Sequence, residues 1–387
     1  MLPRLLYVGD VPVEASYHGS ALLYRWLSDY PVDRLTILET ATKSEPARRL
    51  PQVPYISCPI GKQRWLNTRF HPYAMAWFTR AGKRSGPRLS QSMNGFAFES
   101  VLTVAHGFGW LAAAEIARKR SVPLHLAVHD DWPRVADVPP RFRNWLDDQF
   151  ARVYHQAQTR LCVSPAMSRF YEDRYGAPAT VIYPTRAAEQ IEFEEPPARL
   201  GDNDSRFTIA FAGTINSQGY IDSLRALQTA LKTVNGRLLI FGPLTVDVSK
   251  QIGLNDSNIE IRGLLTSDQL QVRLREEADT LFVPMSFSET DRPNMEMAFP
   301  SKLADCTATG VPLVIYGPAY CSAVTWAREN PGVAEVVETE TALSDAICRL
   351  ANDPAHKLAL GSRALEVGRQ YFLHARTQQI VHQLLSV

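Results

Sequence analysis

The sequence predicts an α/β protein with two domains, each built around a parallel sheet. Short buried strands alternate with helical stretches, as at 101–105, 110–119 and 122–128, and this spacing is typical of right-handed parallel units. The 387 residues, 45% of them apolar, are enough for two or three domains. An acidic, proline-containing stretch at 186–205 has no hydrophobic periodicity and indicates an interdomain linker. We therefore expect domains at 1–185 and 206–365, with a C-terminal helix at 366–387 that crosses back to the first.

The composition is that of an ordinary globular chain with a formal net charge of +1. Its five cysteines lack CxxC or CxxH spacing, which favours reduced thiols in the cytoplasm over disulfides or a structural zinc. The N-terminus enters a strand directly, without the basic start and long apolar core of a signal peptide. No stretch approaches the roughly 20 apolar residues of a membrane span. We expect a cytoplasmic protein whose contact with a membrane, at its inner face, would be peripheral.

Positive charge is concentrated in one segment of the first domain. Residues 46–98 contain no Asp or Glu but nine Arg and Lys residues, so the rest of the chain sums to −8 (1 − 9). Aromatic residues such as Trp65 and Trp77 lie among these cations, and the mixture suits an anionic membrane surface or a lipid-diphosphate acceptor. A solvated face over buried aromatics is the alternative. No recognised nucleic-acid motif accompanies the segment, so we expect no nucleic-acid partner.

Three positions in the first domain are candidates for ligand contact. His106 and His129 follow the predicted strands at 101–105 and 122–128, and ligands of parallel sheets lie beyond these strand ends. Gly19 stands at the start of the first helix, where it would allow a ligand close to the backbone. The alternatives are ordinary: a histidine satisfied within the fold and a turn glycine beside a capping serine.

The second domain opens with a strand, a glycine-containing loop and a helix. The strand covers 207–212, Gly213 and Gly219 bound the loop, and the helix runs over about 220–234. This order is the one that cradles phosphates with backbone N–H groups, although the glycine pair is weak by itself.

The stretch 299–315 combines an anion site with a carboxylate. Pro300 and Ser301 predict a helix start, so Ser301 and Lys302 would lie at the positive end of a short helix. Asp305 follows one turn later and could accept hydrogen bonds from a ribose diol. A diphosphate with a ribose alongside is half of a nucleotide-sugar site. An ordinary helix N-terminus of an α/β domain could produce the same pattern.

The motif Pro-Ser-Lys-Leu-Ala-Asp-x4-Gly-Val-Pro-Leu-Val at 300–314 resembles the donor-site helix of GT-B glycosyltransferases, in particular the family-4 type. Asp305 stands five residues before Gly310, where that family has its ribose-binding Glu. The string Val-His-Asp-Asp-Trp at 128–132 is similar to the family segment whose histidine lies beside the transferred sugar. The resemblance implies a GT-B fold, with two Rossmann-like domains facing a central cleft, and transfer of a sugar from a nucleotide diphosphate sugar to an acceptor hydroxyl.

The resemblance also implies roles for individual residues. The catalytic candidates are His129, Lys302, Glu289 and Glu296. The donor-binding candidates are Gly19, Gly213, Thr214, Arg262, Gly263, Leu264, Arg292, Pro300, Ser301, Lys302, Leu303 and Asp305, with 262–264 against the base. The acceptor-binding candidates are Arg64, Trp65, Arg69 and His106. The acceptor would be a glycan or a lipid-linked glycan, and stereochemistry would be retained by analogy.

Three positions depart from the family pattern. Met297 replaces its first Glu, so the acid facing the donor sugar stays open between Glu289 and Glu296. Thr214 and Gln218 replace the Arg and Lys that usually neutralise the diphosphate. Lys302, with Arg292, could supply this charge. The sequence contains no Asp-x-Asp motif in the right place, so we expect metal-independent chemistry and no cofactor besides the donor.

The departures leave a rival from another class, a non-catalytic GT-B subunit that binds a nucleotide sugar or glycan in a glycosylation complex. A solute-binding protein fits less well without a signal sequence, and the acid and histidine set of a sugar-nucleotide epimerase is not found.

Overall fold

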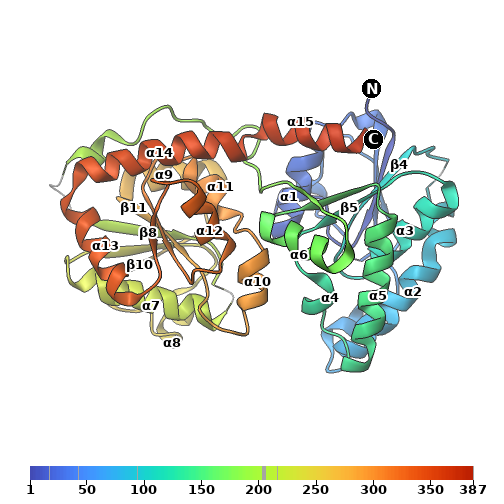
Figure 1. The fold of residues 1–387 in the computed structure, drawn as a ribbon, viewed down its shortest axis with the longest axis horizontal. Helices are drawn as coiled ribbons and strands as arrows, with labels where there is room; N and C mark the ends of the chain where they lie inside the picture. The colour runs from blue at the N-terminus through green and yellow to red at the C-terminus, as the bar shows by residue number, and fades with distance from the viewer. Residues whose placement is uncertain (17, 42, 94, 203–205, 216, 387) are drawn as a thin grey trace. The chain divides into compact units, whose positions relative to one another are not determined.

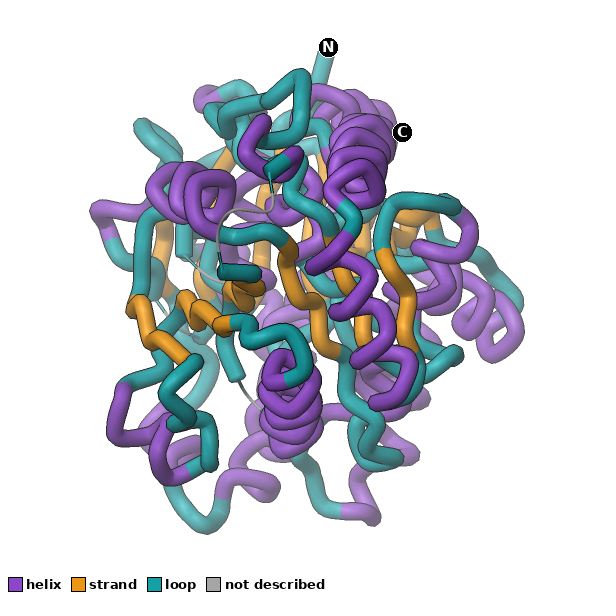
Figure 2. Tube along the Cα trace, turned by 90° about the vertical axis from the view of Figure 1, so that its left-hand side faces the viewer, coloured by secondary structure: helices purple, strands orange, loops and turns teal. Residues whose placement is uncertain are grey.

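The computed structural model describes residues 1–386 except 17, 42, 94, 203–205 and 216, and of His18 it describes the backbone alone. The chain forms two compact units, one of Met1–Tyr183 with His374–Val387 and one of Pro184–Leu373. Each unit is a parallel sheet whose successive strands are joined through helices (Figure 1; Figure 2). The predicted α/β class with two Rossmann-like domains is confirmed.

The first unit contains a seven-stranded sheet in the order β3-β2-β1-β4-β5-β6-β7, with all pairs parallel. The central strands are buried along their whole length because helices cover both faces. The strands are β1 (Leu5–Gly9), β2 (Leu35–Glu39), β3 (Tyr55–Ser57), β4 (Ser100–Val104), β5 (Leu124–Val128), β6 (Thr159–Cys162) and β7 (Thr180–Val181). The helices are α1 (His18–Leu27), α2 (His71–Gln91), α3 (Gly109–Arg120), α4 (Trp132–Val135), α5 (Pro140–Gln156), α6 (Pro165–Tyr175) and α15 (His374–Leu385), with short 3-10 turns η1 (Val32–Arg34), η2 (Pro46–Arg48) and η3 (Gln63–Asn67).

The second unit contains a six-stranded parallel sheet in the order β10-β9-β8-β11-β12-β13. Its strands are β8 (Thr208–Ala212), β9 (Arg237–Phe241), β10 (Ile259–Gly263), β11 (Thr280–Pro284), β12 (Leu313–Tyr316) and β13 (Glu335–Val337). Its helices are η4 (Ala198–Gly201), α7 (Gln218–Lys232), α8 (Val246–Gln251), α9 (Ser267–Glu277), α10 (Arg292–Met297), α11 (Lys302–Thr307), α12 (Ser322–Glu329), α13 (Glu340–Asn352) and α14 (Pro354–Phe372).

Each sheet reverses its strand order once, between β1 and β4 in the first unit and between β8 and β11 in the second. At such a point the loops after the two strands diverge and leave a crevice for ligands. In the second unit these loops begin at Gly213 and Met285. The fold alone therefore directs attention to the residues around Gly213 and around 285–299.

Two segments differ from the sequence-based expectation. Residues 186–205 were expected as a linker, but the second unit includes them, and Arg186 in this stretch is only 1% exposed; residues 203–205 lie outside the described part. The stretch 285–299 is rich in polar residues, which favours a loop, but it contains α10, whose Met295 and Met297 are buried. An apolar side chain at 297 thus fills interior space where the family places a carboxylate.

The segment 366–387, expected to cross back to the first domain, is divided between two helices. α14 belongs to the second unit and ends at Phe372, and α15 belongs to the first unit, where Gln378 donates a hydrogen bond to the carbonyl oxygen of Arg25 in α1. In Figure 1 α15 lies beside the chain termini of this unit. No described helix has both the length and the apolar composition needed to cross a bilayer.

Candidate functional site

Lys302 and Gly213 lie against each other at the point of strand-order reversal in the second unit. Gly213 follows β8 with a φ of 146°, and a Cβ atom added to it would stand 3.3 Å from Lys302 Nζ. The Lys302 ammonium also lies 4.6 Å from the centroid of the Phe211 ring and 5.4 Å from that of Tyr220. Lys302 and Gly213, 89 positions apart in the sequence, thus place a cation beside the partly exposed backbone of a glycine loop, where a diphosphate could approach.

The Lys302 ammonium carries its charge without a carboxylate partner among the described residues. Desolvation lowers its pKa to about 8, opposed by the nearby Cys306. A desolvated cation costs folding free energy unless it is paired, and the aromatic rings compensate for only part of that cost. An anion bound beside Lys302 would supply the missing partner. Such an unfavourable charge is typical of functional sites.

The short helix α11 carries the rest of the predicted donor motif. It begins at Lys302, one residue after the exposed Ser301, whose side chain makes no capping hydrogen bond. Leu303 is fully buried and anchors the helix, while Pro300 and Asp305 are partly exposed. The packing therefore leaves the Ser301 side chain accessible at the helix start, as the donor role requires.

The acids Glu289 and Glu296 are joined by Arg292. Arg292 Nη1 lies 3.4 Å from Glu289 Oε2, Arg292 Nε lies 2.8 Å from Glu296 Oε1, and the guanidinium stacks 4.5 Å over the Tyr320 ring. Because two carboxylates already share this cation, Lys302 is the better candidate for neutralising a diphosphate. Both acids remain candidates for the group facing the donor sugar.

The other predicted donor residues lie at the ends of β8 and β10. Thr214 and Gln218 are exposed, and Gln218 donates a hydrogen bond to Asp222 within α7. Arg262 pairs with Glu260 and Glu277, so its side chain is engaged by the protein. Gly263, with φ of 72°, has open space around its Cα, and Leu264 is 57% exposed. The Gly263 carbonyl oxygen accepts a hydrogen bond from the Gly242 N–H group. The role of 262–264 against the base remains a prediction.

Three of the predicted residues in the first unit lie together. His129 Nδ1 stands 3.2 Å from the position of a Cβ on Gly19, and the His129 ring meets Trp26 edge to face at 5.6 Å. Desolvation lowers the pKa of His129 to about 4, assisted by the neighbouring His106. The Nε2 atom of His129 is buried and has no hydrogen-bond partner among the described residues. Neutral at pH 7, this imidazole offers an unsatisfied polar atom at the carboxyl end of β5.

The predicted acceptor residues contact different neighbours in the structure. His106 packs against Trp132 at 4.4 Å. Arg64 and Trp65 belong to η3, and Arg69 stacks on Phe70 at 5.0 Å. None of these three has a hydrogen bond, ion pair or ring contact with His106 in the described part of the chain. The acceptor assignment of Arg64, Trp65 and Arg69 remains a prediction.

Sequence reasoning missed two residues that hold the sites in shape. Asp10 follows β1 and accepts hydrogen bonds from the N–H groups of Phe108 and Gly109 and from Thr40 Oγ1, so it fixes the loop that carries His106. Burial raises the pKa of Asp10 to about 6. Arg186 donates hydrogen bonds to the Ala304 carbonyl and to Thr307 Oγ1 and pairs with Glu192. Asp10 could have been found from the sequence, because an acid directly after a buried strand indicates a site residue. Arg186 could not have been found, because its partners are distant in the sequence.

No cluster of three or more His, Cys, Asp or Glu residues able to hold a metal occurs in the described part of the chain. The metal-independent chemistry expected from the sequence remains a prediction.

Comparison with known proteins identifies the fold class. Residues 33–186 match the model of Glycosyltransferase Family 4. The chain is similar to HepE from Anabaena, solved in complex with UDP and glucose, with a TM-score of 0.68 at 13% identity over 99% of both chains. Sucrose-phosphate synthase from Thermosynechococcus elongatus matches with 0.70 at 13% over 98% of both. An alpha,alpha-trehalose-phosphate synthase (UDP-forming) from Burkholderia vietnamiensis matches with 0.63 at 13% over 99% of this chain and 100% of that one. No curated protein sequence matches the chain.

The family match lies in the first unit, whereas the motif at 300–314 that carried the resemblance lies in the second. Two separate parts of the sequence thus support the same assignment. The chain has the GT-B fold of glycosyltransferases, and its residues 33–186 are family-4-like in sequence.

Proposed function

We propose that the protein is a glycosyltransferase that moves a sugar from a nucleotide diphosphate sugar to an acceptor hydroxyl, without a metal and with retention at the anomeric carbon. The observation that carries this proposal is the desolvated Lys302 ammonium, which has no carboxylate partner among the described residues and lies against the backbone of Gly213 at the switch point of the second unit. The nucleotide would be uridine diphosphate by analogy with HepE, which was solved with UDP.

The chemistry requires stabilisation of a leaving diphosphate. As the bond from the anomeric carbon to the diphosphate oxygen breaks, negative charge grows on that oxygen, and a positioned cation in a desolvated site lowers the barrier. Lys302 would supply this charge together with the N–H groups of the Gly213 loop. Removal of one such donor costs about 3 kcal/mol of transition-state stabilisation in other enzymes.

The residues of the first unit would serve the sugar and the acceptor. His129 is neutral at neutral pH, so it would act through hydrogen bonding at the free Nε2 atom. The acceptor would be a glycan or a lipid-linked glycan. Residues 46–98 would contact an anionic membrane surface at the inner face, supported by the exposed side chains of Trp65, Phe70, Tyr73 and Trp77 among the cations.

The alternative is a non-catalytic GT-B subunit, favoured by the uncharged Thr214 and Gln218 and by the buried Met297. Thermal-shift measurements with a panel of nucleotides and nucleotide sugars test binding, and release of nucleoside diphosphate from the best ligand, with and without glycan acceptors, tests turnover. Binding with turnover supports the transferase. Binding without turnover under all conditions supports the subunit. No binding contradicts the transferase and favours a subunit that binds a glycan alone.

A further inference from the structure

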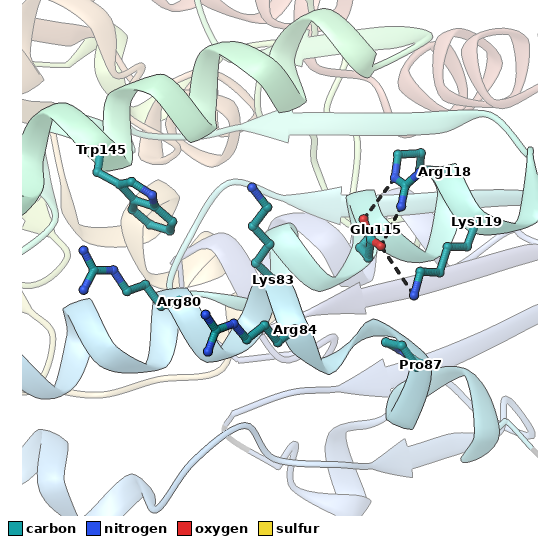
Figure 3. A pocket seen from close by; sticks show the side chains of 8 residues that line it. All are labelled: Arg80, Lys83, Arg84, Pro87, Glu115, Arg118, Lys119 and Trp145. Atoms are coloured by element: carbon teal, nitrogen blue, oxygen red, sulfur yellow. Dashed lines mark hydrogen bonds and ion pairs between the residues drawn. The ribbon is translucent and has the colours of Figure 1, made fainter.

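We propose that a basic groove on α2, α3 and α5 of the first unit is a binding site for a polyanion carrying several phosphate groups. The groove has a volume of about 710 Å³ and contains five cationic side chains and one carboxylate. It is lined by Arg80, Lys83, Arg84, Pro87, Glu115, Arg118, Lys119 and Trp145 (Figure 3). Arg80, Lys83 and Arg84 belong to the segment 46–98 proposed above to contact an anionic surface, and the groove adds Arg118 and Lys119 of α3 to them. The inference does not depend on the sugar-transfer reaction.

Close packing of two helices assembles the charge. A Cβ atom added to Gly82 in α2 would clash with the carbonyl oxygen of Phe108, and one added to Gly86 would stand 3.0 Å from Glu115 Cγ. Because these glycines let α2 approach α3, cations of both helices face one groove. Like charges that line one groove repel each other and weaken folding. Clustering these cations does not stabilise the fold, so a bound anion is the better explanation for it.

The single carboxylate cannot neutralise the groove. Glu115 lies 2.8 Å from Arg118 Nη2 and 3.5 Å from Lys119 Nζ, and these two ion pairs use all of its charge. Lys83 donates a hydrogen bond to the neutral amide of Gln149 at 2.7 Å. Arg84 has no hydrogen bond or ion pair with any described residue. The net charge of the lining is +4 (5 − 1), and it is open to an external anion.

Aromatic rings order one of the cations. The Arg80 guanidinium lies 5.6 Å from the centroid of the Trp145 ring and 5.0 Å from that of Phe142. A stacked arginine loses less side-chain freedom when it binds, and its planar fork suits phosphate oxygens. Figure 3 shows Arg80, Lys83 and Arg84 on one helix, with Trp145 on a second and the Glu115 ion pairs on a third.

The groove is separate from the pair His106 and His129. Those histidines follow β4 and β5 at the carboxyl edge of the sheet. α3 starts at that edge and leads back to the start of β5, so its last turn, with Arg118 and Lys119, lies toward the opposite edge. Ten residues separate Gly109 from Lys119, which is about 15 Å along a helix. A ligand of this groove would therefore be an additional molecule, or a distant part of a long acceptor.

The phosphate groups could belong to a soluble polyanion or to the headgroups of a bilayer, and two binding measurements separate these sources. Inositol hexakisphosphate is the soluble probe, titrated by calorimetry into the full chain. Vesicles of phosphatidylglycerol and phosphatidylcholine are the membrane probe, measured by co-sedimentation. The variant Arg84→Ala/Lys119→Ala removes two groove charges, and Lys43→Ala/Arg152→Ala removes two exposed charges of the same unit outside the groove.

We expect the groove variant to bind at least one probe tenfold or more weakly than the wild type, with the control variant within twofold. The control variant should unfold at the wild-type temperature, and the groove variant at that temperature or above it, because it loses two charges that repel their neighbours. Loss for the hexakisphosphate assigns a soluble ligand, and loss for vesicles alone assigns headgroups. The proposal would be overturned if the groove variant bound both probes with wild-type affinity, if the two variants lost equal affinity, or if the wild type bound neither probe. Thermal shifts with UDP should be the same in the wild type and both variants. This measurement tests the proposed donor site independently of the groove.

Discussion

Arg186 Nε donates a hydrogen bond of 3.1 Å to the carbonyl oxygen of Ala304, 118 residues further along the chain. The same guanidinium reaches Thr307 Oγ1 and pairs with Glu192, and its side chain is 1% exposed. It therefore joins the first residues of the second unit to α11, the helix that begins with Lys302. A stretch that looked like a linker thus supports the candidate donor site.

Replacement of Arg186 by methionine should destabilise the second unit. The change leaves the Ala304 carbonyl and Glu192 without their donor, and removal of one partner of a buried charged pair costs about 3 kcal/mol. Urea unfolding measures this loss. Arg363→Met is the matched control, because Arg363 pairs with Glu366 on the surface of α14, where the cost is below about 1 kcal/mol. Equal stability of the two variants would show that Arg186 is not a support of α11.

The Lys302→Met variant should lose nucleotide binding while gaining stability. The substitution removes a desolvated ammonium whose pKa is lowered to about 8, and an apolar chain of similar length fills the same space. We expect a rise of about 1 kcal/mol in the free energy of unfolding, since only part of the burial cost is recovered when the cation–π contacts are lost. Thermal melts with and without UDP measure both quantities.

Lys250→Met, on the exposed face of α8, is the control and should change neither the stability nor the nucleotide binding. A destabilised Lys302→Met variant would instead indicate a structural lysine, as would loss of turnover and stability in equal measure for Lys302→Ala.

The order of strands and helices was predictable, because buried strands have short apolar runs that end at glycine, proline or histidine. β4, α3, β5, β8 and α7 lie within two residues of the expected bounds. α2 was missed because Gly82, Gly86 and Pro87 interrupt its pattern. In the structure the two glycines allow close packing on α3, so tertiary contacts outweigh their low helix propensity.

The candidate site was predictable where a local motif carried it. Lys302 and Gly213 were both named from the sequence, but their contact depends on the adjacency of β8 and β11, which the chain order does not reveal. The partners of Arg292 could be guessed from helical spacing. Arg186 could not be found, since its role depends on a carbonyl group 118 residues away, and backbone groups leave no trace in the sequence.

Nucleotide affinity should fall as the pH rises through about 8. The unbound protein holds the Lys302 ammonium with its pKa near 8, so at pH 9 most molecules have lost the charge that would attract a diphosphate. Lys302→Arg keeps its charge over this range, and its affinity should be nearly constant between pH 7 and 9. Calorimetric titration of UDP at pH 7, 8 and 9 gives the comparison. A wild-type affinity that does not change with pH would mean that Lys302 is not in contact with the phosphates.

The free energy of unfolding should decrease as the pH falls from about 6.5 to 4, in part because of His129. Desolvation lowers its pKa from 6.5 to about 4 in the folded protein, so in this interval the unfolded chain binds more protons, and stability is lost as the pH falls. The full shift corresponds to about 3 kcal/mol, an upper limit for a partly exposed ring. The buried His125 acts in the same direction, whereas Asp10, with a pKa raised to about 6, acts in the opposite one.

The His129→Gln variant separates these effects. Urea unfolding at pH 7 and pH 4.5 should show a smaller loss of stability for the variant than for the wild type. Identical losses would mean that the imidazole is already solvated in the folded state, and its role beside a sugar would lose its physical basis.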